Sequence, residues 1–125
     1  DRRAAQDGPT WVYYVHWQSP LDGGRWGAPH TIDIPLLFGN LEHSAYTRDA
    51  GPEAGRLSGQ MADALIAFAR SGDPNAAGAP AWPRFRLPQR AALIFDRQLS
   101  VHDDPRGAER RLFAPVPYVQ PGTRD

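Results

Sequence analysis

The stretch that decides the fold class of this chain is Trp11-Val12-Tyr13-Tyr14-Val15-His16-Trp17. Its aromatic and β-branched residues are typical of a β-strand, and large side chains alternate onto both faces. Residues 13, 15 and 17 face one side, and residues 12, 14 and 16 face the other. Because both faces need cover, we predict a strand at 12–17 inside a sheet that other layers enclose.

The strongest periodic pattern in the sequence runs from about residue 52 to residue 71. Apolar residues recur there at three- and four-residue steps, namely Leu57, Met61, Leu65 and Phe68, with Ala64 and Ala69 beside them. This spacing places them on one face of an amphipathic helix. Pro52 and Glu53 suit its first turn, and Gly72 before Asp73-Pro74 suits its end. We therefore predict a helix at 52–71 that covers one face of a sheet.

Shorter elements flank this helix. A loop rich in glycine and proline runs from residues 19–27 to His30, and the apolar run 32–38 is too short to decide between a brief helix and an extended piece. Residues 92–95 and 99–102 are typical of two short strands around a turn. We predict a hairpin at 92–102.

The C-terminal part carries one more helix signal. Asp104 is expected to cap a last short helix whose first position is Pro105. The tail from residue 115 to residue 125 holds three prolines and is expected to fray.

Composition excludes several classes of function. The 125 residues carry 14 basic and 14 acidic side chains, a balance that gives no electrostatic reason to expect nucleic acid or an anionic membrane as partner. The length suits one globular unit, and no apolar run is long enough to span a membrane. The absence of Cys excludes disulfides, thiolate catalysis and Cys-ligated zinc, but it leaves the compartment open. We expect no cofactor.

No complete catalytic motif stands in the sequence: it has no Gly-x-Ser-x-Gly, no glycine-rich phosphate loop and no His-Glu-x-x-His. Four histidines remain as candidates. His16 lies inside the aromatic strand and is expected to be a packed or hydrogen-bonded structural residue. His43 and His102 lie in polar surroundings and are expected to be solvated. His30 follows a loop that leaves a strand, which is where reacting groups often lie.

Chemistry alone leaves the role of His30 open between catalysis and a plain surface position. A metal site is a further alternative, because His30 and Asp33 are three residues apart, a spacing that would place both on one face if the segment formed a helical turn. That site would need at least one more ligand, and none stands at a recognisable spacing, so we expect no metal.

An ordered series of motifs extends over roughly residues 11–112. It comprises Gly27-Ala28-Pro29-His30-Thr31-Ile32-Asp33-Ile34-Pro35-Leu36-Leu37-Phe38-Gly39-Asn40, then Ala67-Phe68-Ala69-Arg70-Ser71-Gly72-Asp73-Pro74-Asn75, then Trp82-Pro83, and finally Asp103-Asp104-Pro105 with Arg110. Together these motifs resemble the segment around the catalytic histidine of type-B carboxylesterases, the family that includes para-nitrobenzyl esterases and cholinesterases. Two positions depart from the family pattern: Thr31 stands where Gly is common, and Asp33 where Glu is common.

The resemblance implies an α/β fold, namely the C-terminal part of an α/β-hydrolase mixed sheet. Strand 12–17 would belong to that sheet, and the His30 loop would leave its end. The helix at 52–71 would cover one face, and the hairpin at 92–102 would extend the sheet edge. Residues 1–125 are then expected to be a segment of the carboxylesterase domain and not a complete catalytic domain.

The resemblance also implies that His30 is the general acid and base of a Ser-His-Asp/Glu triad. In the family the nucleophile, the oxyanion-hole glycines and the triad acid all precede this segment. Asp33 is expected to orient the loop and not to act as the triad acid. The chain alone is therefore expected to be inactive. Its expected partners are a small-molecule ester in the full-length protein and the upstream half of the same domain, and the isolated chain is expected to self-associate.

Two readings from other classes stay open at this stage. The first is a non-catalytic, cholinesterase-like adhesion or binding domain, which would keep the fold without a working triad. The second is an independent small binding module, which would need to close its own core. The coding sequence upstream of Asp1 distinguishes them: a Gly-x-Ser-x-Gly there supports the esterase, a substituted serine the adhesion protein, and a start codon the module.

Overall fold

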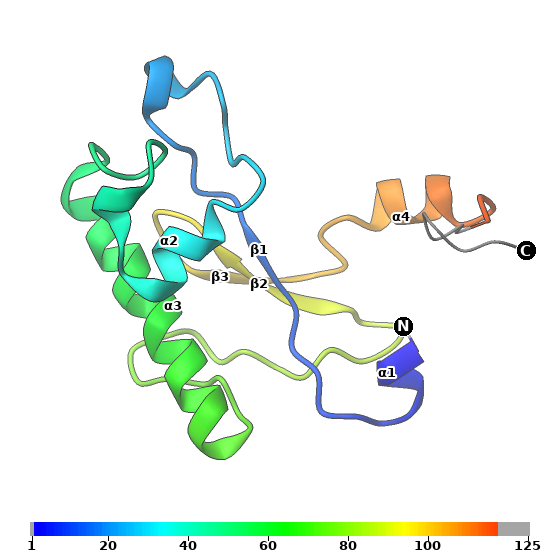
Figure 1. Cartoon of the computed structure of the whole chain (residues 1–125). Coiled ribbons are helices and arrows are strands. Elements are labelled where there is room, and N and C mark those ends of the chain that lie inside the picture. Colours follow the sequence, from blue (N-terminus) through cyan, green and yellow to red (C-terminus); the bar gives the residue numbers. More distant parts are fainter. Residues whose placement is uncertain (1, 118–125) are drawn as a thin grey trace, which may run out of the picture.

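The computed structural model describes residues 2–117 and contains a small three-stranded sheet with helices around it (Figure 1). The elements in chain order are α1 (Arg2–Ala5), β1 (Tyr13–Val15), the 3₁₀ turn η1 (Leu21–Gly24), α2 (Asp33–Phe38), the 3₁₀ turn η2 (Leu41–His43), α3 (Gly51–Ser71), β2 (Ala91–Phe95), β3 (Ser100–Asp103) and α4 (Gly107–Phe113). The undecided run 32–38 is thus a helix, and α1 adds a short helix that the sequence analysis did not predict. No described helix is both long enough and apolar enough to cross a bilayer.

The sheet is mixed and has the strand order β1-β2-β3. β1 is parallel to β2, with Tyr13 opposite Leu93, and β2 is antiparallel to β3, with Leu93 opposite Val101. The predicted hairpin is therefore confirmed, with strand bounds shifted by about one residue. In this part of the chain β3 lies at one edge of the sheet and β1 at the other.

The first strand is shorter than the predicted 12–17. The amides of His16 and Trp17 both donate to the carbonyl of Phe95, at 2.8 and 3.1 Å. Two successive donors on one acceptor interrupt the regular ladder, so the strand ends at Val15. His16 consequently lies beyond the strand with an exposed side chain. Its ring contacts that of Tyr14, at a centroid distance of 6.3 Å, but no hydrogen bond to the ring is found among residues 2–117. The expectation that His16 is a packed or hydrogen-bonded structural residue is therefore met only by this exposed ring contact.

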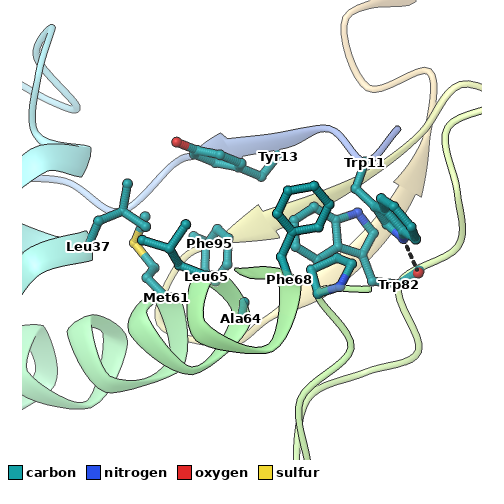
Figure 2. A pocket seen from close by; sticks show the side chains of 10 residues that line it. Trp11, Tyr13, Leu37, Met61, Ala64, Leu65, Phe68, Trp82 and Phe95 are labelled. Carbon is teal, nitrogen blue, oxygen red and sulfur yellow. Dashed lines mark hydrogen bonds between the residues drawn. The ribbon is translucent and has the colours of Figure 1, made fainter. Parts of the chain in front are cut away.

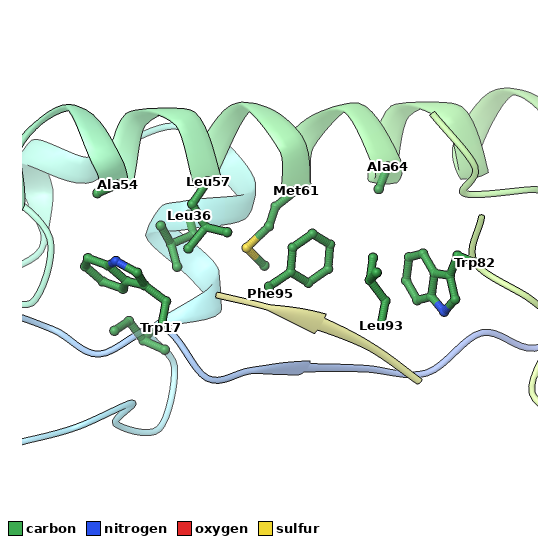
Figure 3. Close-up of a cluster of buried hydrophobic side chains, with 10 residues drawn as sticks. Trp17, Leu36, Ala54, Leu57, Met61, Ala64, Trp82, Leu93 and Phe95 are labelled. Atoms are coloured by element: carbon green, nitrogen blue, oxygen red, sulfur yellow. The ribbon is translucent and has the colours of Figure 1, made fainter. Parts of the chain in front are cut away.

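One face of the sheet packs against α2 and α3 and forms the core (Figure 3). α3 begins and ends as predicted: Pro52 lies in its first turn, and Gly72 is left-handed, with φ of 74°, and donates its amide to the Phe68 carbonyl at 2.7 Å. The buried core residues are Trp17, Ile32, Leu36, Ala54, Leu57, Met61, Ala64, Trp82, Leu93 and Phe95. The covering helix of the sequence analysis is therefore confirmed.

The first turn of α3 is also tied to the sheet by polar contacts. Oε1 of Glu53 accepts a hydrogen bond from Nε1 of Trp17 at 2.9 Å and another from Nε of Arg97 at 3.2 Å. Glu53 thus links the helix start to the end of β1 and to the hairpin turn. The sequence predicted only its favourable position at the helix N-terminus.

The predicted apolar stripe of α3 is only partly buried. Leu57 and Met61 are 2% and 1% exposed, but Leu65 and Phe68 are 40% and 45% exposed. α2 packs against α3, whereas the described part of the chain supplies no layer over its C-terminal half. The stripe was correctly placed along the helix, but the extent of its burial was wrong.

The opposite face of the sheet is more open. Val12 and Tyr14 line a hollow of about 260 Å³, and His16 and Ile94 line another of about 610 Å³. In Figure 1, α2 and α3 lie together at one side of the strands, while α4 stands apart. Ala92 and Ile94 of β2 are buried on this face, at 0% and 4% exposed, but Val12 and Tyr14 are only partly buried, so the described chain covers this face incompletely.

The last helix begins later than expected, at Gly107, and its N-terminal flanking residue is Arg106. The Asp104 side chain does not cap it. Instead its carboxylate accepts two hydrogen bonds from Arg110, at 2.7 and 3.1 Å. These bonds, with the charge of the guanidinium, lower the pKa of Asp104. The carboxylate forms this bidentate pair with the guanidinium because it is stronger than the single bond to a backbone amide that a helix cap would provide. Of the tail that was expected to fray, residues 118–125 lie outside the described residues.

Candidate active site

His30 lies at the end of the loop that leaves β1, directly before α2. Its side chain is exposed, and among residues 2–117 no hydrogen bond to its imidazole is found. The loop includes η1, whose Asp22 and Gly23 have positive φ angles. His30 therefore stands at the surface of the described chain, on a connection between a strand and a helix.

The residue after His30 has an unusual backbone conformation. Thr31 has φ of 70°, in the left-handed region that glycine adopts freely and β-branched residues rarely do. Its carbonyl accepts the amide of Ile34 at 3.0 Å as the chain enters α2. The resemblance expects Gly at this position, and the turn geometry gives the physical reason.

The start of the His30 loop is fixed by a buried serine. Ser19 is fully buried, and its hydroxyl donates to the carbonyl of Tyr46 at 2.7 Å and accepts the amide of Leu21 at 3.2 Å. Its amide donates to the carbonyl of Gly27 at 2.9 Å. These three bonds join the two ends of the loop to each other and to the chain ahead of α3.

The far side of the His30 turn is fixed by two more contacts. The hydroxyl of Ser58 on α3 donates to the Leu36 carbonyl of α2 at 2.7 Å, and both residues are buried. The phenol of Tyr13 donates to Oδ2 of Asp33, in the first turn of α2, at 3.2 Å. Asp33 thus ties α2 to β1, which is the kind of contact that a loop-orienting role requires.

The other histidines lie away from His30 in the chain and in different surroundings. His43 is exposed and lies 3.3 Å from the Glu42 carboxylate. His102 is exposed, with Nε2 3.0 Å from Oγ of Ser100. The prediction that both are solvated is confirmed. Over residues 2–117, no three metal-binding side chains lie close enough together to hold an ion, so the His30–Asp33 pair gains no third ligand there.

An apolar hollow of about 210 Å³ lies between the sheet, α2 and α3 (Figure 2). Its lining comprises Trp11, Tyr13, Leu37, Met61, Ala64, Leu65, Phe68, Pro74, Trp82 and Phe95. Figure 2 shows Trp11, Phe68 and Trp82 gathered at one end and Leu37 and Met61 at the other. The Trp11 and Phe68 rings meet edge to face at 5.8 Å. His30 is not among the lining residues.

Comparison with known proteins then decides the family. The sequence profile described as the carboxylesterase family matches residues 1–113. The chain belongs to this family. It is 29% identical over 109 residues to a para-nitrobenzyl esterase of Bacillus subtilis (strain 168), which covers 86% of this chain and 22% of that protein. It is 35% identical over 98 residues to a phenmedipham hydrolase of Pseudarthrobacter oxydans, which covers 75% of this chain and 20% of that protein.

Solved structures agree. A carboxylesterase of Geobacillus stearothermophilus superposes with a TM-score of 0.75 at 32% identity, over 89% of this chain and 23% of that one. The predicted α/β-hydrolase fold is therefore confirmed. The chain spans only about a fifth of the length of the curated relatives named above.

Two of the carboxylesterase motifs contact each other in the structure. The side-chain amide of Asn75 donates to the Trp82 carbonyl at 3.0 Å, and its oxygen accepts the Trp82 amide at 2.7 Å. Asp73 accepts hydrogen bonds from the amide and the side chain of Asn75, which lower the pKa of Asp73. The Gly-Asp-Pro-Asn end of α3 therefore serves to hold the Trp82-Pro83 segment against the core.

Sequence reasoning missed Ser19 and Ser58. Ser19 stands before Pro20 among loop-forming residues, and its sequence context suggested nothing beyond a turn. Ser58 offered a signal, because it is a polar residue next to Leu57 on the buried side of an amphipathic helix. A polar residue in that position needs a hydrogen-bond partner, and the Leu36 carbonyl provides it.

Proposed function

We propose that this chain is the C-terminal segment of a carboxylic-ester hydrolase and that His30 is the general acid and base of its Ser-His-Asp/Glu triad. In the full-length protein the substrate is a small-molecule ester. The upstream half of the same domain contributes the serine, the triad acid and the oxyanion hole. The chain alone has no nucleophile and is inactive.

The position of His30 carries this proposal. It occupies the histidine of the motif Gly27–Asn40 within a family match that spans residues 1–113. It lies on a loop between a strand and a helix, with an exposed imidazole that a neighbouring segment can reach. The next residue, Thr31, has φ of 70°, a backbone conformation that explains why glycine is common at this position of the motif. His16, His43 and His102 are also exposed, but none of them occupies the histidine of the motif or is followed by a residue with a positive φ angle.

In the proposed mechanism, a serine of the full-length protein attacks the ester carbonyl while His30 takes the hydroxyl proton. His30 then gives this proton to the departing alkoxide, which leaves an acyl-enzyme. Water attacks the acyl group with His30 again as base, and the returned proton restores the serine. Histidine suits both roles because imidazole exchanges protons near neutral pH. The oxyanion hole stabilises both tetrahedral intermediates.

The test compares His30→Ala with His43→Ala in the full-length protein. We expect His30→Ala to lower kcat/KM for an activated ester on the order of a million-fold, because removing a triad member has about that cost. His43→Ala removes an exposed histidine outside the loop and should leave turnover near wild type. Thermal melting of both variants verifies that they fold.

A fluorophosphonate probe completes the test. It should label a serine of the full-length protein and leave the 125-residue chain unlabelled. If His30→Ala keeps most of the wild-type kcat/KM with its fold intact, the assignment of His30 is wrong. If the full-length protein neither turns over esters nor reacts with the probe, the adhesion or binding domain is the better reading.

A further inference from the structure

We propose that Ser19 is a positioning residue for His30, acting through the loop whose two ends it joins. This inference rests on the proposed catalytic role of His30. Ser19 touches neither the imidazole nor any group assigned to the reaction. Its effect comes from holding the base of the loop, and therefore the backbone that carries His30, in one place.

The hydroxyl of Ser19 makes a donor and an acceptor bond at the same time. It donates to the Tyr46 carbonyl at 2.7 Å and accepts the Leu21 amide at 3.2 Å, in a fully buried position. A partly buried carbonyl and a partly buried amide would therefore lose their partners if the hydroxyl were removed. Tyr46 is 27 residues away in sequence, so the bond fixes the loop relative to a separate part of the fold.

The backbone of Ser19 reaches the other end of the same loop. Its amide donates to the Gly27 carbonyl at 2.9 Å, only three residues before His30. Trp26 adds a second contact to the same support, with its ring edge to face on Tyr46 at 6.4 Å. Residues 20–26 therefore form a closed loop whose neck is Ser19, and His30 follows directly from that neck.

The downstream side of His30 is held independently. Ser58 fixes the Leu36 carbonyl of α2, and Asp33 accepts the phenol of Tyr13. With that side anchored, a change at Ser19 shifts only the upstream support of the imidazole. A general base must lie within hydrogen-bond reach of the proton that it takes, and a displacement of about 1 Å costs up to about 100-fold in rate.

The experiment uses the full-length protein and compares Ser19→Ala with Asn75→Ala. Asn75 is a matched control, because its side chain also donates one hydrogen bond and accepts another, to the Trp82 carbonyl at 3.0 Å and from the Trp82 amide at 2.7 Å, beyond the C-terminal end of α3 and outside the His30 loop. For para-nitrophenyl acetate we expect Ser19→Ala to lower kcat by about 10- to 100-fold with KM changed less than about threefold. The rate of serine phosphonylation by a fluorophosphonate should fall in parallel. Asn75→Ala should lower the melting temperature by a similar amount but keep kcat near wild type.

Equal losses of kcat in the two variants, or a wild-type kcat in Ser19→Ala, would overturn the proposal, because Ser19 would then be structural only. If Ser19→Ala does not fold, Ser19→Cys replaces it: the side-chain volume is similar, but the thiol is a weak donor, so the same loss of kcat is expected. Wild-type turnover in His30→Ala would instead overturn the proposed function, and the Ser19 result would not bear on that outcome.

Discussion

The two halves of α3 carry the same apolar pattern but have different surroundings. In the N-terminal half, Leu57 and Met61 are buried against α2 and the sheet. In the C-terminal half, Leu65 and Phe68 of the same stripe are 40% and 45% exposed. The pattern of a helix predicts which face seeks cover, but the cover itself must come from another segment. The difference indicates that the C-terminal half of α3 is covered by a layer that the described residues do not supply.

The exposed half of α3 borders the apolar hollow that also contains Trp11 and Tyr13. We expect the upstream half of the carboxylesterase domain to cover it in the full-length protein. β1 also lies at a sheet edge in the described chain, where its outer backbone groups are open to a further strand. Three predictions use the contrast between the two halves, beginning with the largest expected effect.

The isolated 125-residue chain should self-associate or remain partly molten at micromolar concentration. Apolar surface left wet costs roughly 25 cal/mol per Å², against a net stability of about 5–15 kcal/mol for a whole domain. Sedimentation equilibrium and near-ultraviolet circular dichroism measure the outcome. Phe68→Gln should weaken association by roughly tenfold. Leu112→Gln, which changes an exposed apolar residue on α4, serves as the control.

A monomer with sharp aromatic signals and a cooperative melt would contradict this prediction. The chain would then close its own core, and the reading as an independent module would gain support.

Replacing one leucine by alanine in each half of α3 should lower the unfolding free energy by different amounts. Leu57→Ala removes a buried side chain and is expected to cost about 2–5 kcal/mol of unfolding free energy, whereas Leu65→Ala should cost less than about 1 kcal/mol in the isolated chain. Urea unfolding, at a concentration where the chain is monomeric, measures both. In the full-length protein the cost of Leu65→Ala should rise toward that of Leu57→Ala. Equal costs in the isolated chain would show that the outer half is already packed.

Tyr13 reports on the boundary between the halves. Its pKa is raised above the ordinary 10.0, first by partial burial in the hollow and then by the charge and hydrogen bond of Asp33. Because the folded state holds the phenol proton more tightly than the unfolded state, its contribution to stability is present below pH 10.0 and is lost as the pH rises through the folded pKa. Ultraviolet titration against Tyr13→Phe measures this value.

Asp33→Asn should lower the Tyr13 pKa part of the way, because desolvation remains. If the upstream half of the domain covers the hollow in the full-length protein, the pKa of Tyr13 should be raised further. An ordinary pKa for Tyr13 in the isolated chain would mean that the hollow is as wet as bulk solvent.

The sequence by itself determined the features that depend on near neighbours. The bounds of α3, its glycine cap, the hairpin and the order of the carboxylesterase motifs all follow from spacing and local backbone preference. The motif also singled out His30. Its catalytic role and the inactivity of the isolated chain remain predictions.

Tertiary structure alone decided which parts of these patterns are buried and which carbonyls the polar side chains reach. Phe68 lies at nearly the same angle around α3 as Leu57, yet Leu57 is 2% exposed and Phe68 is 45% exposed. Asp104 is a residue type that often caps helices, but in the structure its carboxylate accepts a hydrogen bond from Arg110. The sequence around Ser19 predicted only a turn. In the structure its hydroxyl donates a hydrogen bond to the carbonyl of Tyr46, which is 27 residues away in sequence. Burial and hydrogen-bond partners depend on segments that come into contact only when the chain folds. The local sequence pattern therefore does not predict them.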